Sequence, residues 1–212
     1  GNFLVITYRE LRELEIAVIT AQLKGQQVVD VDKLVLLNVD RFYGIEIEEF
    51  PAQIAQVAMW LMDHQMNLRV SEEFGLYFAR IPLRTSPHIV HGNALKLEWN
   101  EVLPAQRCCF VLGNPPFVGA KFMDDAQRED TRAVFAGIDN AGLLDFVAAW
   151  YVKAAKYVRL QGEALVPGPA GAGWPADAHE PSVFKIAPAS HPTPASGAGP
   201  ATTRCAFVST NS

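Results

Sequence analysis

Cysteine is scarce, and the positions of the cysteines argue against both disulfide bonds and a cysteine-ligated metal site. The chain of 212 residues holds three cysteines, of which Cys108 and Cys109 are adjacent and Cys205 stands alone. No Cys-x-x-Cys pair occurs, and His88 and His91 have no third ligand at a suitable spacing. We therefore expect neither a disulfide framework nor a metal site. Free thiols are typical of a reducing compartment, so we expect a cytoplasmic protein.

Long apolar runs and an excess of basic residues are also missing. No apolar stretch approaches the roughly 20 residues that span a bilayer, so we expect no membrane association. Eighteen Lys and Arg against 23 Asp and Glu give a formal net charge of −5. Neutralising DNA phosphates requires Lys and Arg, so the chain is not expected to grip DNA unaided. The length and the 50% hydrophobic content fit one α/β domain.

Regular apolar periodicity is absent from residues 162–203. This segment holds 8 of the 14 prolines and many alanines and glycines. Such a composition cannot bury enough apolar surface to offset the entropy lost on ordering, so we predict a disordered insertion. It is either a genuine linker or the product of a reading-frame error. The predicted organisation is therefore a domain over 1–161, the insertion over 162–203, and a last strand over 204–212.

The most informative stretch is a strand that ends in a rigid turn. An apolar run over 108–112 predicts a buried strand, which stops at Gly113 and is followed by Asn114-Pro115-Pro116-Phe117. Two prolines remove two backbone donors and fix two φ angles, so this turn is stiff and presents carbonyl oxygens. It could hold a flat amino-bearing group by its N–H hydrogens. An ordinary strand-ending turn is the alternative.

This motif resembles the catalytic motif of S-adenosylmethionine-dependent amino methyltransferases, above all those that methylate N6 of adenine in DNA. The segments GAKFMDDAQREDTRAVF and LLDFVAAWYVKAAKYV resemble the large bacterial adenine methyltransferases of restriction–modification and phage-exclusion systems. The resemblance covers residues 1–160 and returns at 204–212. It implies a Rossmann-like class I methyltransferase sheet with flanking helices.

Two further strand ends carry polar residues that suit a nucleotide. Strand-like residues lead to Glu46, and a helix with Pro51 in its first turn follows. A carboxylate at such a position can accept hydrogen bonds from both ribose hydroxyls, although a solvated acid is the alternative. A second short strand, over 88–91, ends in Gly92-Asn93. The resemblance assigns Glu46 to the cofactor ribose, Ile47 to its adenine ring, and Asn93, with Ala94 beside it, to the adenine amino group.

The amino-terminal residues begin a helix. In the resembled family a strand and a glycine-rich turn precede this helix and bind the methionine end of the cofactor. The resemblance places Gly1 at the last glycine of that turn, with Asn2 and Phe3 following as cofactor contacts. It thus implies that the sheet lacks its first, central strand, and that the isolated chain is an inactive fragment.

Apolar spacing predicts which face each helix buries. The predicted stripes are Leu4, Tyr8, Leu11, Leu14 and Val18 for the first helix; Ile54, Val57, Ala58, Leu61 and Met62 for the second; and Leu144, Val147, Ala148, Tyr151, Val152 and Ala155 for a helix over 143–157.

The implied reaction moves a methyl group from S-adenosylmethionine to N6 of an adenine that has left the DNA duplex. The Asn114 side-chain oxygen and the Pro115 carbonyl would accept the two N6 hydrogens, Pro116 would stiffen the turn, and Phe117 would stack on the base. DNA would be held through a separate target-recognition domain, and the sequence does not specify an oligomeric state. The alternatives are a methyltransferase of a protein glutamine amide or of RNA, and an inactive remnant.

Overall fold

A computed structural model describes residues 1–23, 33–75, 85–138, 141–159 and 205–208. The predicted disordered insertion over 162–203 lies outside the described residues, as do residues 209–212 of the predicted last strand. No helix in the described ranges combines the length and apolar character needed to cross a bilayer.

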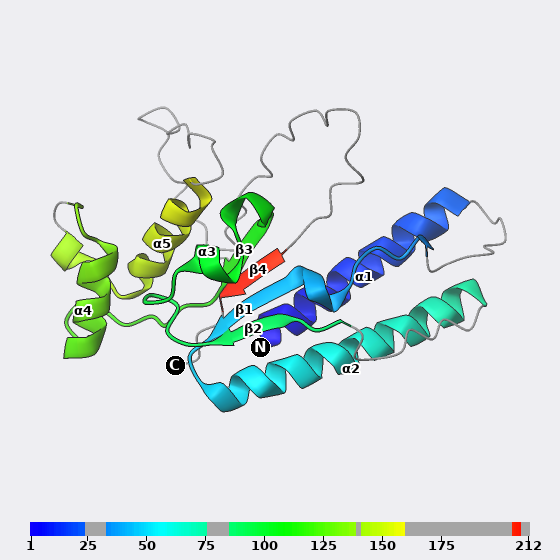
Figure 1. The fold of residues 1–212 in the computed structure, drawn as a ribbon, viewed down its shortest axis with the longest axis horizontal. Coiled ribbons are helices and arrows are strands. Elements are labelled where there is room, and N and C mark those ends of the chain that lie inside the picture. Colours follow the sequence, from blue (N-terminus) through cyan, green and yellow to red (C-terminus); the bar gives the residue numbers. More distant parts are fainter. Residues whose placement is uncertain (24–32, 76–84, 139–140, 160–204, 209–212) are drawn as a thin grey trace, which may run out of the picture.

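Four parallel strands form the sheet. They are β1 (Phe42–Glu46), β2 (His88–His91), β3 (Phe110–Gly113) and β4 (Cys205–Val208), in the order β2-β1-β4-β3. Figure 1 shows them in the middle of the molecule with helices on both sides. The predicted α/β class with flanking helices is confirmed, and the described sheet is parallel.

The strand that holds the sheet together comes from the far end of the described chain. β4 pairs with β1 on one side and with β3 on the other, and β1 and β3 do not pair with each other. Residues 205–208 therefore occupy the place between β1 and β3 in the described sheet. The absence of a first, central strand stays a prediction.

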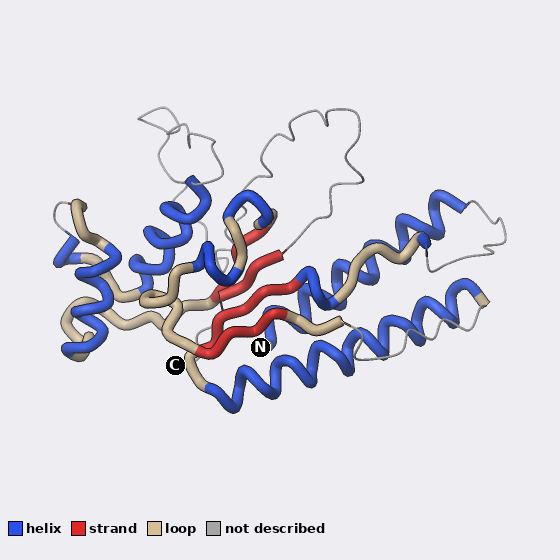
Figure 2. The backbone as a smooth tube through the Cα atoms, viewed as in Figure 1, coloured by secondary structure: helices blue, strands red, loops and turns tan. Residues whose placement is uncertain are grey.

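Helices cover both faces of the sheet, as Figure 2 shows. Along β1 successive side chains point to opposite faces, so Phe42 packs into one apolar cluster while Tyr43 and Ile45 pack into another. The Phe42 cluster includes residues of α1 (Asn2–Leu23) and α2 (Glu49–Phe74). The opposite cluster includes residues of α3 (Trp99–Val102), α4 (Asp125–Val134) and α5 (Val147–Arg159).

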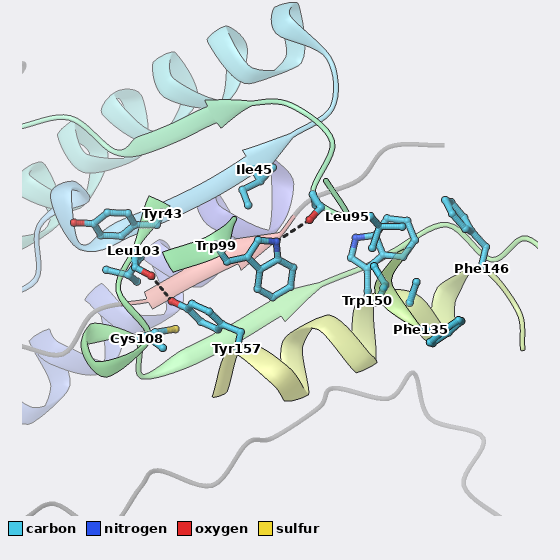
Figure 3. Packing of buried hydrophobic residues seen from close by; sticks show 14 of the residues in the cluster. Tyr43, Ile45, Leu95, Trp99, Leu103, Cys108, Phe135, Phe146, Trp150 and Tyr157 are labelled. Carbon is cyan, nitrogen blue, oxygen red and sulfur yellow. Dashed lines mark hydrogen bonds between the residues drawn. The ribbon is translucent and has the colours of Figure 1, made fainter. Parts of the chain in front are cut away.

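The second cluster is rich in aromatic rings (Figure 3). The Trp99 indole N–H donates to the Ala94 carbonyl at 2.8 Å, and the Tyr157 hydroxyl donates to the Leu103 carbonyl at 2.7 Å. Because each ring buries its apolar body and still has a partner for its polar atom, these residues fix α5 against the loop that follows β2.

The predicted buried faces of all three helices are wrong in part. On α1, Leu14 and Val18 are exposed, and on α2, Ile54, Val57 and Leu61 are exposed. The residues actually buried are Leu4, Tyr8, Arg12, Ile16 and Ile19 on α1; Ala52, Ala55, Met59, Met66, Asn67 and Val70 on α2; and Ala149, Trp150 and Tyr157 on α5.

Close approach of α1 and α2 explains the difference. A Cβ atom on Gly1 would lie 2.6 Å from the Cβ of Ala55, so the two helices meet there through small residues. Small residues let the backbones approach closely, and the larger Ile54 and Val57 then face outward. A scan for the bulkiest apolar stripe selects the wrong face of such a helix.

The strand predicted over 108–112 begins later and is less buried. β3 starts at Phe110, whose side chain is partly exposed, and Val111 and Leu112 are half-buried. Within the described sheet β3 pairs only with β4, so it is an edge strand, and an edge strand buries less of its side chains.

A fully buried arginine joins α1, α2 and the segment before β1. Arg12 donates to the Leu37 carbonyl at 3.0 Å and to Asn67 Oδ1 at 2.9 Å, and lies 3.4 Å from Glu15 Oε2. Arg12 is absent from the apolar stripe predicted for this helix, yet it is one of the residues that α1 buries. The buried charge is tolerated because both terminal nitrogens have acceptors, although Nε has no hydrogen-bond partner among the described residues.

We predict that Arg12→Met lowers the free energy of unfolding by about 3 kcal/mol, because Asn67 and the Leu37 carbonyl lose their donor. The control is Arg9→Met on the same helix, which removes a half-exposed side chain and should change stability by less than about 0.5 kcal/mol. Urea unfolding followed by circular dichroism measures both. Equal midpoints for the two variants would contradict the role given to Arg12.

Candidate functional site

Parallel pairing brings three strand ends to one edge of the sheet. Glu46 of β1 lies opposite His91 of β2, and both Ile45 and Gly113 lie opposite Val208 of β4. Neighbouring strands are about 4.8 Å apart, so the ends of β1 and β3 are about 10 Å apart across β4. The residues that follow these ends, Asn93 and Asn114, therefore share one edge with Glu46.

The Glu46 carboxylate is buried at this edge, with 2% of the residue exposed. Its Oε1 accepts a hydrogen bond from the Ile47 amide at 3.1 Å, and its Oε2 lies 3.5 Å from the Gly1 amino nitrogen. The contact to Gly1 is long, so Oε2 retains capacity to accept other hydrogen bonds. The neighbouring Ile47 is 42% exposed, which leaves an apolar surface beside the carboxylate.

The Gly92-Asn93 turn is fixed to β1. The Gly92 amide donates to the Glu46 carbonyl at 2.7 Å. Gly92 has φ +156°, and a Cβ there would lie 2.8 Å from Leu97 Cδ1, so both backbone conformation and space favour glycine. The predicted positions of Glu46 and Asn93 at adjacent strand ends are thus held together by a direct backbone hydrogen bond.

Asn93 is oriented by two partners. Its Oδ1 accepts from the Leu95 amide at 2.8 Å, and its Nδ2 donates to Asp130 Oδ2 at 2.7 Å. The buried Asp130 also forms an ion pair with Lys96 at 3.2 Å. Sequence reasoning missed Asp130. The signal that could have indicated a role for Asp130 is its position four residues before Val134, which places the carboxylate on the buried face of α4.

Lys153 is a second supporting residue that sequence reasoning missed. From α5 its ammonium donates to the carbonyls of Leu95 and Leu97, each at 2.6 Å. Burial lowers the pKa of Lys153, while the negative charges of Glu98 and Asp130 act in the opposite direction. The loop after Asn93 is thereby held against α5.

The Asn-Pro-Pro-Phe turn is open to solvent at its two outer residues. Asn114 is exposed and Phe117 is 76% exposed, whereas Pro115 is buried. The next residues are held in place by the segment before α5: the Phe146 amide donates to the Val118 carbonyl at 2.9 Å, and the Ala120 amide donates to Asp145 Oδ1 at 3.0 Å. Asn114 and Phe117 are thus accessible to solvent, and the exit of the turn, residues 118–120, is held by hydrogen bonds to the segment before α5.

The remaining predicted residues surround this edge or contact the sheet. Asn2 and Phe3 lie in the first turn of α1 beside Gly1, and both are exposed, whereas Ala94 is buried. His88 stacks on the Tyr43 ring at 4.4 Å, and His91 Nε2 lies 3.1 Å from the Ile47 carbonyl. Among the described residues no group of His, Cys, Asp and Glu could hold a metal ion.

Comparison with known proteins identifies the family. The model of the MmeI DNA-methyltransferase domain matches residues 1–166. The chain belongs to the MmeI DNA-methyltransferase domain family. DNA methyltransferase A of Bacillus subtilis (strain 168) is 37% identical over 162 residues, which are 74% of this chain and 18% of that protein.

A solved structure agrees with this membership. The type IIL restriction-modification enzyme MmeI, in complex with DNA, matches with a TM-score of 0.69 and 61% sequence identity, over 75% of this chain and 21% of the MmeI chain. The chain therefore spans about a fifth of the length of these relatives.

We predict that Asp130→Ala loosens the Asn93 turn, because it removes the partner of Asn93 Nδ2 and of Lys96. Hydrogen exchange of the peptide over 88–103 should be faster by about tenfold or more, as expected for loss of a buried charge-assisted hydrogen bond. The control is Glu129→Ala, an exposed neighbour on α4. If both variants exchange like the unaltered chain, Asp130 does not hold the turn.

Proposed function

We propose that this domain transfers a methyl group from S-adenosylmethionine to N6 of adenine in DNA. The observation that carries the proposal is the Asn114–Phe117 turn, which is exposed at Asn114 and Phe117 and lies at the same sheet edge as the buried Glu46 carboxylate and the oriented Asn93. Membership in a DNA-methyltransferase domain family supports the reaction class and the DNA substrate. The chemistry of the turn favours an exocyclic amine as the acceptor, and the choice of adenine N6 rests on the resemblance of the Asn114–Phe117 motif to that of adenine methyltransferases.

The residues at the ends of β1 and β2 fit the donor. Glu46 would bind the ribose hydroxyls through Oε2, and Ile47 offers an exposed apolar surface for the adenine ring. Asn93 Oδ1 has one hydrogen-bond partner in the Leu95 amide, and a carbonyl oxygen can accept a second hydrogen bond from an exocyclic amine. We also assign Gly1, Asn2, Phe3 and Ala94 to the donor site. When bound, the donor supplies a methyl group that is already activated on a sulfonium.

The Asn114–Phe117 turn would position the acceptor. Adenine N6 is a weak nucleophile because its lone pair is delocalised into the ring. The Asn114 side-chain oxygen and the Pro115 carbonyl would accept its two hydrogens and favour a more tetrahedral nitrogen. Pro116 has no N–H donor and keeps the turn stiff. Positive charge developing on N6 would then lie next to two oxygen acceptors, and no prior deprotonation is required.

The target base would leave the duplex to reach this turn. Phe117 is 76% exposed, so its ring is available to stack on an extruded base, a contact worth about 1–3 kcal/mol. Because the domain is acidic overall, we propose that other parts of the full-length protein supply the target-recognition domain and most of the DNA affinity. Cys108 and Cys109 are free thiols, which suits work in the cytoplasm.

We predict that Asn114→Ala reduces methyl transfer at least about 100-fold while the affinity for S-adenosylmethionine changes little, because one of two acceptors for N6 is lost. The host is a chimera in which residues 1–159 replace the matching segment of MmeI. Tritium transfer from labelled donor is measured on DNA, followed by base analysis. The control is Asn38→Ala. Asn38 lies before the opposite end of β1, and its side chain makes no capping hydrogen bond to the 3-10 helix that follows it.

Near-normal turnover by Asn114→Ala would refute the role of the turn. Label found on cytosine, or transfer to RNA or protein in place of DNA, would refute the assignment of adenine N6 as the acceptor.

A further inference from the structure

An open cavity of about 350 Å³ lies between α4 and the segments that lead into α4 and α5, and it has no part in the account above. Its lining residues come from α4 and from the segments that lead into α4 and α5: Met123, Arg128, Thr131, Arg132, Phe135, Ile138, Gly142 and Leu144. Figure 1 shows α4 at one end of the molecule, beyond the end of the sheet. The cavity combines two cations with an apolar wall.

The hydrogen bonds that hold the exit of the turn also position two of the segments that line this cavity. The segment leading into α5 is bound to the exit of the turn through Phe146 to Val118 and Asp145 to Ala120. Leu144 directly precedes this contact and Met123 follows the same exit, and both line the cavity. Two residues that line the cavity are therefore connected, through these hydrogen bonds and the main chain, to the residues that directly follow the turn.

The two guanidinium groups are available for a ligand. Arg128 and Arg132 are four residues apart on α4, so their side chains lie on one face of the helix. Within the described part of the chain neither arginine forms an ion pair with a carboxylate. Arg128 makes one long contact, of 3.5 Å, to the Lys121 carbonyl.

The acidic neighbours on α4 do not pair with these arginines. Asp124 caps the helix by accepting from the Gln127 amide at 2.7 Å, and Asp130 is occupied by Asn93 and Lys96. Asp125 and Glu129 are exposed, and within the described residues neither forms an ion pair with Arg128 or Arg132. The cavity therefore presents cations toward solvent in a chain whose net charge is −5.

We propose that this cavity binds the sugar–phosphate backbone of the DNA strand that carries the target adenine. Arg128 and Arg132 bind adjacent phosphates, and the apolar wall formed by Phe135, Ile138 and Leu144 contacts deoxyribose. Arginine suits this task because its planar fork donates two hydrogen bonds to one phosphate. This inference rests on the proposed function for its choice of strand. It assigns a local contact with the DNA backbone to a domain that is acidic overall.

The test is DNA binding by the 212-residue chain without methyl donor. Fluorescence anisotropy is measured with a labelled 12-nucleotide single strand and with a duplex, between 20 and 200 mM salt. Arg128→Gln with Arg132→Gln should weaken binding at least about tenfold at low salt. The slope of log K against log salt should fall by about 1.4 for the single strand and about 1.8 for the duplex, the values for two phosphates.

The matched control is Arg9→Gln with Arg69→Gln, which removes the same charge from half-exposed positions on α1 and α2. It should leave the salt slope unchanged. Arg128→Lys with Arg132→Lys preserves the charge and should restore the slope. Unaltered melting temperatures confirm that the variants are folded.

The proposal is overturned if the unaltered chain does not bind DNA at 20 mM salt, if the paired Gln variant binds like its control, or if the paired Lys variant loses as much slope as the Gln variant. The readout involves no methyl transfer. Failure here therefore leaves the role of Asn114 standing, and failure of adenine methylation leaves this DNA contact standing.

Discussion

Parallel pairing through β4 is the constraint on which the arrangement of the site depends. β4 contributes four residues, yet it supplies hydrogen-bond partners to both β1 and β3, which do not pair with each other. Because all pairs are parallel, the carboxyl ends of β1, β2 and β3 meet at one edge. Two strand spacings set the distance of about 10 Å between the ends of β1 and β3. This distance separates Glu46, which we propose binds the methyl donor, from Asn114, which we propose binds the acceptor.

A polar network then fixes what the sheet has brought together. Gly92 bonds to the Glu46 carbonyl, Asp130 holds Asn93, and Lys153 holds the carbonyls that follow. These supports come from β2, α4 and α5, so the site is built from elements on one side of the sheet and at its edge. Buried polar groups with satisfied partners define a single arrangement, which is what positioning chemistry requires.

The strand ends could be predicted from the sequence, whereas the helix faces could not. Glu46, Gly92-Asn93 and the Asn-Pro-Pro-Phe turn each carry a local signal, namely a strand followed by a helix-starting or turn residue. Helix faces depend on what packs against them. Ala55 is buried and Ile54 is exposed because α1 approaches closely at Gly1, and Arg12 is buried because Leu37 and Asn67 provide acceptors from distant positions. The supports Asp130 and Lys153 are likewise defined by contacts with residues far along the chain.

The most direct test of this account is the strand register measured by nuclear Overhauser effects in the isotopically labelled chain. The account predicts interstrand contacts from Val208 to both Ile45 and Gly113, in the parallel pattern, and none between β1 and β3. Direct contacts between β1 and β3, or an antiparallel pattern for β4, would contradict it. The ends of β1 and β3 would then lack the separation on which the donor and acceptor positions depend.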